Sequence, residues 1–270
     1  MHMPARLAIR TRVAALLFAP LLLPAASGCD VVTADLKHSE TAEWRKTYEL
    51  APGGRVEINN VNGKIVVEPS TGRSVEVVAV KTARAASSEG AKQALERVEI
   101  EDQSTSEAVR VSTKYPRAGG WMTRGGVNVT YTVHVPAAAE VRFTTVNGGV
   151  ELTGLGGRIT AETTNGGIVA RNVSGAIEAS TTNGGVDVDL ASVAEGGAKL
   201  ECTNGGIKLR ISPDARASIS ASITNGGIDT GSLRLETTES SRRRLVGRLN
   251  GGGPSIRIEG TNGGIVLNAR

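Results

Sequence analysis

The chain has 270 residues, of which 31 are lysine or arginine and 27 are aspartate or glutamate, giving a formal net charge of +4. Three of the basic residues and none of the acidic ones fall in residues 1–28, so the rest of the chain carries a net charge of only +1. A balance this close to neutrality argues against nucleic acid as a partner. With 3 histidines and 2 cysteines, no zinc-ligand spacing or catalytic triad can be assembled from the sequence.

Residues 1–28 have the composition of a targeting segment. Arg6, Arg10 and Arg12 form a basic start, an apolar run follows, and small residues precede Cys29. The run Ala-Ser-Gly-Cys at positions 26–29 is similar to a bacterial lipobox, in which a signal peptidase cuts before the cysteine and the thiol carries lipid. The resemblance implies lipidation of Cys29 and a membrane-anchored cell-envelope protein, periplasmic or surface-exposed. The alternative is an ordinary secretory signal, which would leave a soluble secreted or periplasmic protein.

No apolar stretch after the leader approaches the roughly 20 residues that span a bilayer, so we expect the membrane to be reached by a lipid anchor alone.

Two further segments precede the regular part of the sequence. Residues 29–45 are expected to form a tether. Residues 46–138 are expected to form an irregular β-rich part, and alternating or β-branched residues predict strands over 55–60, 64–68, 74–82, 98–102, 108–113 and 127–135.

One short helix interrupts these strands. Ser87 or Ser88 can cap its N-terminus, and Ala91, Leu95 and Val98 fall on one face at helical spacing. Residues 114–126 read as an exposed loop. Because the end of a repeat stack must be covered to stay soluble, we expect this irregular part to be a cap.

Seven copies of Asn-Gly-Gly lie within residues 139–270; the copy at Asn250 falls outside the rhythm, and the other six recur at near-regular intervals. Their asparagines are Asn147, Asn165, Asn183, Asn204, Asn225 and Asn262. The first five are separated by 18, 18, 21 and 21 residues, a period typical of stacked repeats. Apolar residues recur at +3 and +5 and at −4 and −6 from each asparagine, which is the period-2 pattern of strands with one buried face. The repeat predicts an all-β fold, a β-solenoid of the parallel β-helix type with one coil per repeat.

The corner residues have a structural explanation. A sharp reversal needs positive φ, which glycine adopts freely and asparagine tolerates better than most residues. Stacked asparagines can also hydrogen-bond along the stack in a side-chain ladder. The corners offer amides and no carboxylates, which argues against a calcium-binding repeat. Because Asn-Gly is also a strong hairpin signal, an antiparallel hairpin or meander repeat is the alternative fold.

The serial Thr-Asn-Gly-Gly corners and the run Gly-Gly-Gly-Pro at 251–254 resemble the bacterial β-strand-repeat family called putative adhesin, whose relatives include the head-GIN domains. The likeness covers residues 45–270. It implies a β-solenoid at the cell envelope, with no established catalytic residues to carry over. Some members of this family are linked to envelope-stress sensing.

Solenoids also host carbohydrate-active enzymes, so outward carboxylates are the candidates for chemistry. Glu151 and Asp187 belong to one outward row, and Glu162 and Glu201 to another. A glycosidase needs two carboxylates facing across a substrate, but no cluster of histidine, arginine or aromatic residues supports these rows. We therefore predict no catalytic residue, no cofactor and no metal site. Cys202 stands where other repeats have threonine, and we expect it to be a core residue without a redox role.

The leading hypothesis is a non-catalytic, lipid-anchored envelope protein whose repeats present a surface for another cell, a surface polysaccharide or an envelope protein. Two alternatives stay open. One is a carbohydrate-active enzyme on the same scaffold, and the other is a passive structural or stress-responsive envelope element. The basic run Arg242–Arg244 interrupts the repeat rhythm, and we expect it to decorate a solvated loop, with contact to anionic lipid or surface polymer as the alternative.

Overall fold

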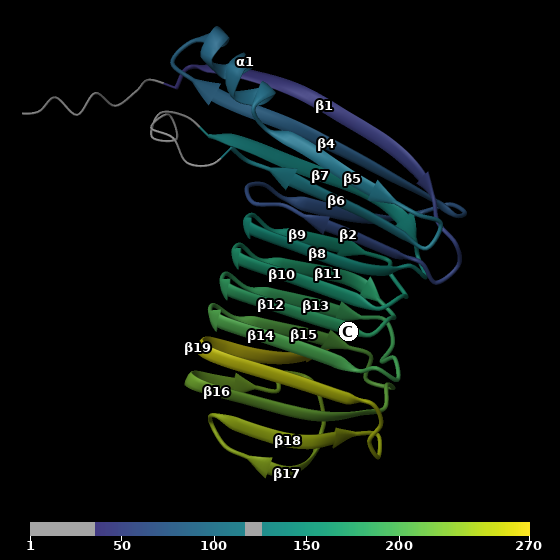
Figure 1. Ribbon diagram of the computed structural model, residues 1–270. Helices are drawn as coiled ribbons and strands as arrows, with labels where there is room; N and C mark the ends of the chain where they lie inside the picture. The colour runs from purple at the N-terminus through teal and green to yellow at the C-terminus, as the bar shows by residue number, and fades with distance from the viewer. Residues whose placement is uncertain (1–35, 117–125) are drawn as a thin grey trace, which may run out of the picture. The chain divides into compact units, whose positions relative to one another are not determined.

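The computed structural model describes residues 36–116 and 126–270. Residues from Ala34 to the C-terminus belong to one compact unit, and its described part consists of strands and one short helix (Figure 1). The predicted targeting segment, Cys29 and most of the predicted loop 114–126 lie outside the described residues.

The described elements follow one another along the chain as a long series of strands. The first half contains β1 (His38–Glu49), β2 (Arg55–Asn59), β3 (Ile65–Ser70), β4 (Ser74–Ala85), α1 (Ser88–Glu96), β5 (Glu99–Ser104), β6 (Ala108–Lys114), β7 (Val127–Pro136), β8 (Glu140–Asn147) and β9 (Val150–Thr153). The second half contains β10 (Ile159–Asn165), β11 (Ile168–Val173), β12 (Ile177–Asn183), β13 (Val186–Leu190), β14 (Ala198–Asn204), β15 (Ile207–Ile211), β16 (Ala217–Asp229), β17 (Glu236–Ser240), β18 (Arg244–Leu249) and β19 (Ser255–Ala269).

Each coil consists of two strands joined by an Asn-Gly-Gly corner. The strands before the corners, β8, β10, β12 and β14, pair in parallel, and so do the strands after them, β9, β11, β13 and β15. Equivalent residues are in register, so Asn165 pairs with Asn147 on one side and with Asn183 on the other. The predicted all-β, solenoid-like fold is confirmed for the repeats.

Antiparallel pairing occurs in the described chain only outside this parallel series. Near the N-terminus β4 pairs antiparallel with β1 and β7, and β5 with β6. At the other end β18 pairs antiparallel with β16 and β17. The alternative of an antiparallel repeat is therefore wrong for the corners, because the strands on both sides of each corner pair in parallel with the equivalent strands of the neighbouring coils.

The stack begins before residue 139. The strands β2 and β3 form an additional coil, which pairs in parallel with β8 and β9, and Asn62 bridges to Asn147. The irregular part and the repeats therefore share one continuous series of strands and are not separated at residue 138.

Residues from His38 onward do not form a tether. They belong to β1, which pairs with β4 along its full length from His38–Ala85 to Glu49–Ser74. Ala42 and Trp44 pack against the core, and Tyr48 is buried. The inward residues of β1 alternate with charged ones, and this period-2 signal places the segment in a strand.

The C-terminal strand does not lie at the end of the stack. Along the chain β16 follows β15, but β19 lies between them in space, pairing in parallel with β14 and β15 on one side and with β16 on the other (Figure 1). The interval between Asn204 and Asn225 is 21 residues, like the preceding interval. The sequence therefore predicts that the coil of Asn225 stacks directly on the coil of Asn204, which is wrong. The segment β17–β18 covers the far side of β16.

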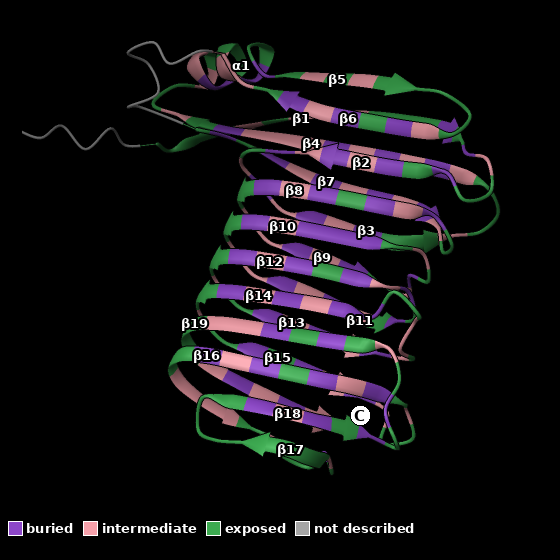
Figure 2. Cartoon of the chain, turned by 60° about the horizontal axis from the view of Figure 1, so that its bottom comes forward, coloured by how far each residue is buried: buried purple, intermediate pink, exposed green. Residues whose placement is uncertain are grey.

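The core lies between the strands before and after the corners and is almost wholly aliphatic. Burial alternates along most strands (Figure 2), as in β13, where Val186, Val188 and Leu190 are buried. Phe143 and Tyr131 are the two largest fully buried side chains among the described residues. Tyr131 shares a 2.6 Å hydrogen bond with Thr113.

The helix α1 forms where the sequence predicts it. Ser87 is the N-cap, and its hydroxyl accepts a hydrogen bond from the backbone N–H of Gly90. Ala91 and Leu95 are buried. Lys81 of β4 donates to the carbonyl groups of Leu95 and Val98, which ties the last turn of the helix to the sheet.

Candidate functional site

The corner asparagines form one hydrogen-bonded row. In each bond the Nδ2 group of one asparagine donates to the Oδ1 atom of its neighbour, at 2.8–2.9 Å. The spatial order is Asn62, Asn147, Asn165, Asn183, Asn204, Asn262 and Asn225. All six asparagines named from the repeat therefore lie in this row, and Asn62 extends it. Because every amide in the middle both donates to one neighbour and accepts from the other, the row is a structural element that links the coils.

The first glycine of each corner is required by the close approach of neighbouring coils. A Cβ atom added to Gly166 or Gly184 would lie 2.0 Å from the carbonyl oxygen of the equivalent glycine one coil away. The second glycine has more room, since a Cβ on Gly185 would lie 3.4 Å from the nearest oxygen. The backbone packing, and not only the turn conformation, selects glycine at the first position.

A second polar row lies just inside the corners. Thr163 and Thr181 each donate from the hydroxyl to a glycine carbonyl of the adjacent coil, both at 2.8 Å. Cys202 occupies the equivalent position, and its thiol donates to the carbonyl oxygen of Gly184 at 3.2 Å. Burial raises the pKa of the Cys202 thiol, which disfavours the nucleophilic thiolate. The predicted core role of Cys202 agrees with this contact.

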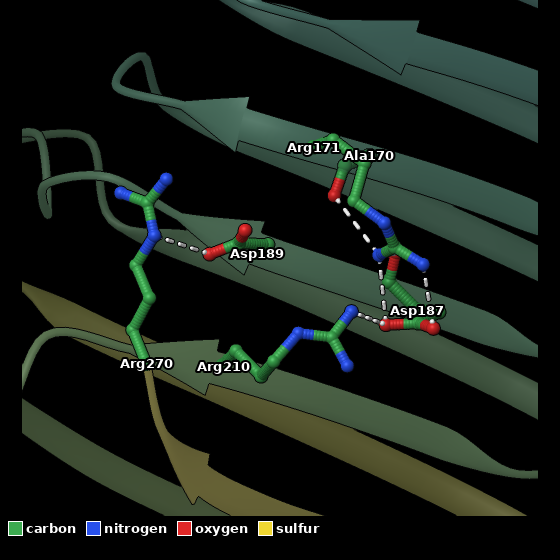
Figure 3. A network of polar contacts seen from close by, with 6 residues as sticks. All are labelled: Ala170, Arg171, Asp187, Asp189, Arg210 and Arg270. Carbon is green, nitrogen blue, oxygen red and sulfur yellow. Dashed lines mark hydrogen bonds and ion pairs between the residues drawn. The ribbon is translucent and has the colours of Figure 1, made fainter.

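A network of charges lies on the strands that follow the corners (Figure 3). The carboxylate of Asp187 on β13 accepts two hydrogen bonds from Arg171 on β11, at 2.9 and 2.8 Å, and one from Arg210 on β15, at 2.7 Å. Next to it, Arg270 forms an ion pair of 3.1 Å with Asp189. The network joins three consecutive coils and the C-terminal residue.

The two arginines control the protonation of Asp187. Partial burial by itself raises the pKa of this carboxyl, but the hydrogen bond and charge of Arg171, together with the charges of Arg210 and Lys208, outweigh it. The pKa of Asp187 is therefore lowered from its ordinary value of 3.8. A carboxylate held ionised in this way is poorly suited to general acid catalysis.

We expect Asp187→Asn to lower the free energy of unfolding by about 1 kcal/mol at pH 7, near the upper end for exposed pairs. The effect is limited because the side chain of Arg171 is 38% exposed and water screens the pair. Since the folded-state pKa is lowered, the stabilisation is present above pH 3.8 and is lost as the pH falls through the folded-state value. The melting temperatures of the Asp187→Asn variant and of the unmutated chain, each at pH 7 and pH 3, measure this loss of stabilisation. The same difference in melting temperature at both pH values would contradict the expected pH dependence.

Of the four candidate carboxylates, Glu162 and Glu201 line one hollow together with Glu178, but the four do not assemble into one site. Glu151 and Asp187 lie on strands after the corner, whereas Glu162 and Glu201 lie on strands before it. Each also has a cationic partner: Glu151 pairs with Lys64 at 2.6 Å, Glu162 with Arg142 at 3.5 Å and Glu201 with Lys199 at 2.9 Å. The arrangement is that of a solvated, ion-paired surface.

The histidines do not form a catalytic or metal centre with these carboxylates. His134 on β7 lies between Glu68 and Glu76, with nitrogen–oxygen distances of 3.6 and 3.4 Å, and His38 begins β1. Within residues 36–116 and 126–270, no group of three or more His, Cys, Asp or Glu side chains is arranged to hold a metal ion. No described helix has the length and apolar character needed to cross a membrane.

The charge network was not predicted from the sequence. The sixth position after the corner asparagine is Arg171, Asp189 and Arg210 in three consecutive coils, and alternating signs at the same place in successive repeats would predict that both arginines pair with Asp189. In the structure both arginines bind Asp187 instead, at the fourth position of its coil, and Asp189 pairs with Arg270. The position of Arg270 depends on the insertion of β19, which the spacing of the repeats does not reveal.

Parallel coils joined by glycine corners and stacked in register define a solenoid-like β-repeat protein. The chain belongs to the Toastrack DUF4097 family, whose model matches residues 54–268. This confirms the resemblance to a β-repeat family without an assigned function. No curated protein matches the chain.

Solved structures that match most of the length of the chain come from several bacteria. A putative cell adhesion protein from Clostridium sporogenes is 11% identical, with a TM-score of 0.44, and the match covers 86% of this chain and 100% of that one. A putative adhesin from Bacteroides fragilis is 11% identical, with a TM-score of 0.30 and coverages of 85% and 97%. A putative lipid binding protein from Parabacteroides distasonis is 10% identical, with a TM-score of 0.28 and coverages of 84% and 96%.

Proposed function

We propose that the chain is a non-catalytic binding module, held at the bacterial cell envelope by lipid on Cys29. The observation that supports binding over catalysis is the state of the outward carboxylates. They are divided between the two kinds of strand, and each is neutralised by a neighbouring cation. Degradation of a polysaccharide that disappears when Glu151, Glu162, Asp187 and Glu201 are replaced by alanine would contradict this part of the proposal.

The rigid corners support the same function. Asparagines, glycines and inward aliphatic residues are fixed by the stacking of the coils, whereas the outward positions differ from coil to coil. At the fourth position after the corner they include Glu151, Val169, Asp187 and Lys208. A scaffold of this kind holds dissimilar side chains at strand spacing of about 4.8 Å, which suits recognition of an extended partner such as a surface polymer or an envelope protein.

The anchor is proposed from the sequence Ala-Ser-Gly-Cys at positions 26–29. The described strands start at His38, nine residues after Cys29. A fully extended chain spans about 3.5 Å per residue, so these residues can reach about 30 Å. The first strand of the module would thus lie within about 30 Å of the lipid-bearing cysteine.

We expect Cys29→Ala to move the protein from the membrane fraction to the soluble fraction, because the thiol proposed to carry the lipid would be removed. Immunoblots of fractionated cells, combined with metabolic labelling by a fatty-acid analogue, measure the change. Cys202→Thr is the matched control, since it removes the other cysteine and replaces its thiol with a hydroxyl that can donate to the carbonyl oxygen of Gly184. Unchanged membrane partitioning of Cys29→Ala would contradict the lipid anchor.

A further inference from the structure

The segment 230–250 concentrates positive charge at the end of the stack. It contains five arginines and two glutamates, a net charge of +3, whereas residues 29–270 as a whole carry only +1. The segment includes β17 and β18, which cover β16, the last strand with a corner asparagine in the spatial order of the row. The sequence predicts a solvated loop at Arg242–Arg244; Arg242 and Arg243 lie in an exposed bend, and Arg244–Leu249 is a strand.

Four of these arginines have no acidic partner within the described residues. They are Arg234, Arg242, Arg243 and Arg248, and all four are exposed. Arg244, in contrast, pairs with Glu239 at 2.8 Å. The backbone of the unpaired residues is nevertheless fixed, because the carbonyl groups of Arg242 and Arg243 accept hydrogen bonds from Ile228 and Ile223. Anchored guanidinium groups without partners are preorganised for an external anion.

A line of serines runs beside these arginines. Ser218, Ser220 and Ser222 are the outward residues of β16. On one side their register partners on β18 include Arg248 and Arg244, and on the other side β19 places Arg257 opposite Ser220. Arg257 pairs with Glu259 at 2.6 Å, so the hydroxyl groups form the floor of a strip in which the guanidinium group without an acidic partner is that of Arg248, on the β18 edge. Both kinds of side chain donate hydrogen bonds to phosphate oxygens.

The geometry points to a linear polyanion as the occupant. Arg244 and Arg248 are four residues apart on one strand, which is about 13 Å, a span that a chain of phosphates can bridge and a single phosphate cannot. The exposed large hydrophobic side chains of the described residues are Leu36, Val61 and Val146, so none belongs to this end of the stack. A membrane-binding surface would add apolar or aromatic side chains that enter the bilayer.

We propose that the strip formed by β16 and β18, with Arg242, Arg243 and Arg248 at its edge, binds a linear polymer bearing phosphate groups. This inference rests on the proposed function as a binding module and names the chemistry of its partner. It does not depend on the lipid anchor. The strip binds through guanidinium–phosphate contacts along β16, and the serine hydroxyl groups donate to the same polymer.

The test compares two triple variants in the full-length chain carrying Cys29→Ala. The first carries Arg242→Ser, Arg243→Ser and Arg248→Ser. The control carries Arg73→Ser, Arg84→Ser and Arg158→Ser, which remove the same charge from exposed positions elsewhere. Both should keep the melting temperature of the parent. The probe is end-labelled inorganic polyphosphate, and its binding is followed by fluorescence anisotropy at 50 and 200 mM salt.

We expect the parent and the control to bind polyphosphate with dissociation constants within about threefold of each other, and the first variant to bind at least about tenfold more weakly. The slope of the logarithm of its binding constant against the logarithm of the salt concentration should decrease in magnitude by about 2, because each lost contact with a single-stranded phosphate chain removes about 0.7. An equal loss in both variants would show attraction by net charge alone and overturn the proposal. Tighter, arginine-dependent binding to phosphatidylglycerol vesicles than to polyphosphate at equal phosphate concentration would also overturn it. Lipid anchoring can fail its own test without affecting either result.

Discussion

Gly184→Ala should lower the melting temperature by at least about 6 °C, whereas Gly185→Ala should lower it by no more than about 3 °C. The two glycines are adjacent in one corner, in the middle of the stack. They differ in the distance from an added Cβ to the next coil, 2.0 Å to the carbonyl oxygen of Gly166 for the first and 3.4 Å to that of Gly206 for the second.

The physical reason is overpacking between backbones. The atom that the new methyl group would meet is a carbonyl oxygen held by the pairing of successive coils, so it cannot move without separating them. Gly184 also has a φ of +151°, which side-chain-bearing residues rarely adopt. Overpacking costs about 1–3 kcal/mol and an unfavourable backbone conformation about 1–3 kcal/mol. For a chain of this size each kcal/mol corresponds to about 2–4 °C.

Differential scanning calorimetry of both variants and the parent measures the difference. Gly166→Ala and Gly167→Ala repeat the comparison one coil away, where the corresponding distances are 2.0 and 3.3 Å. Equal losses at the first and second glycines would mean that turn conformation, and not close approach of the coils, selects glycine at the corners.

Phe143→Ala should lower the free energy of unfolding by about 3–5 kcal/mol, the range for removing a buried aromatic ring. Phe143 is fully buried on β8, which pairs with β2 on one side and β10 on the other. It therefore lies where the first coil meets the regular repeats. Its register partners are Ile58 and Ala161, and the small alanine cannot fill the cavity left by the lost ring.

Phe143→Leu is the matched control, because it keeps most of the apolar volume and should cost less than about 1.5 kcal/mol. Urea denaturation followed by circular dichroism measures both variants. A loss below about 1.5 kcal/mol for Phe143→Ala would show that the ring is not required to join the first coil to the repeats.

The period-2 pattern and the Asn-Gly-Gly corners are sufficient to predict the coils, because stacked strands repeat the same local contacts. Val186 and Val188 are buried as their positions after the corner indicate. The asparagine ladder follows from the same repetition. The order of the coils in space cannot be predicted in this way, because any two coils with the same corner can stack. Asn262 lies between Asn204 and Asn225, and nothing in the spacing distinguishes that order from the order of the chain.

The polar surface was predicted less completely than the core. Outward carboxylates such as Glu151 and Asp187 can be found from the strand period, but their partners come from other coils or from the C-terminus. Lys64 approaches Glu151 from the first coil, and Arg270 reaches Asp189 only because β19 is inserted. Long-range pairing of this kind has no local sequence signal, so the ion pairs require the structure, whereas the arginine run of the proposed strip is visible in the sequence.

The order of the coils is tested most directly by pairs of cysteines on outward positions, in a chain carrying Cys29→Ala and Cys202→Thr. Glu201 on β14 pairs with Glu259 on β19, which in turn pairs with Ser222 on β16. Cysteines at 201 and 259 are about 4.8 Å apart, within the Cα range of a disulfide, whereas cysteines at 201 and 222 are about 10 Å apart and outside it. Mild oxidation followed by mass spectrometry of peptides should therefore yield the 201–259 disulfide and not the 201–222 disulfide. Efficient formation of the 201–222 disulfide, without the 201–259 disulfide, would show that the coils stack in chain order and contradict the insertion of β19.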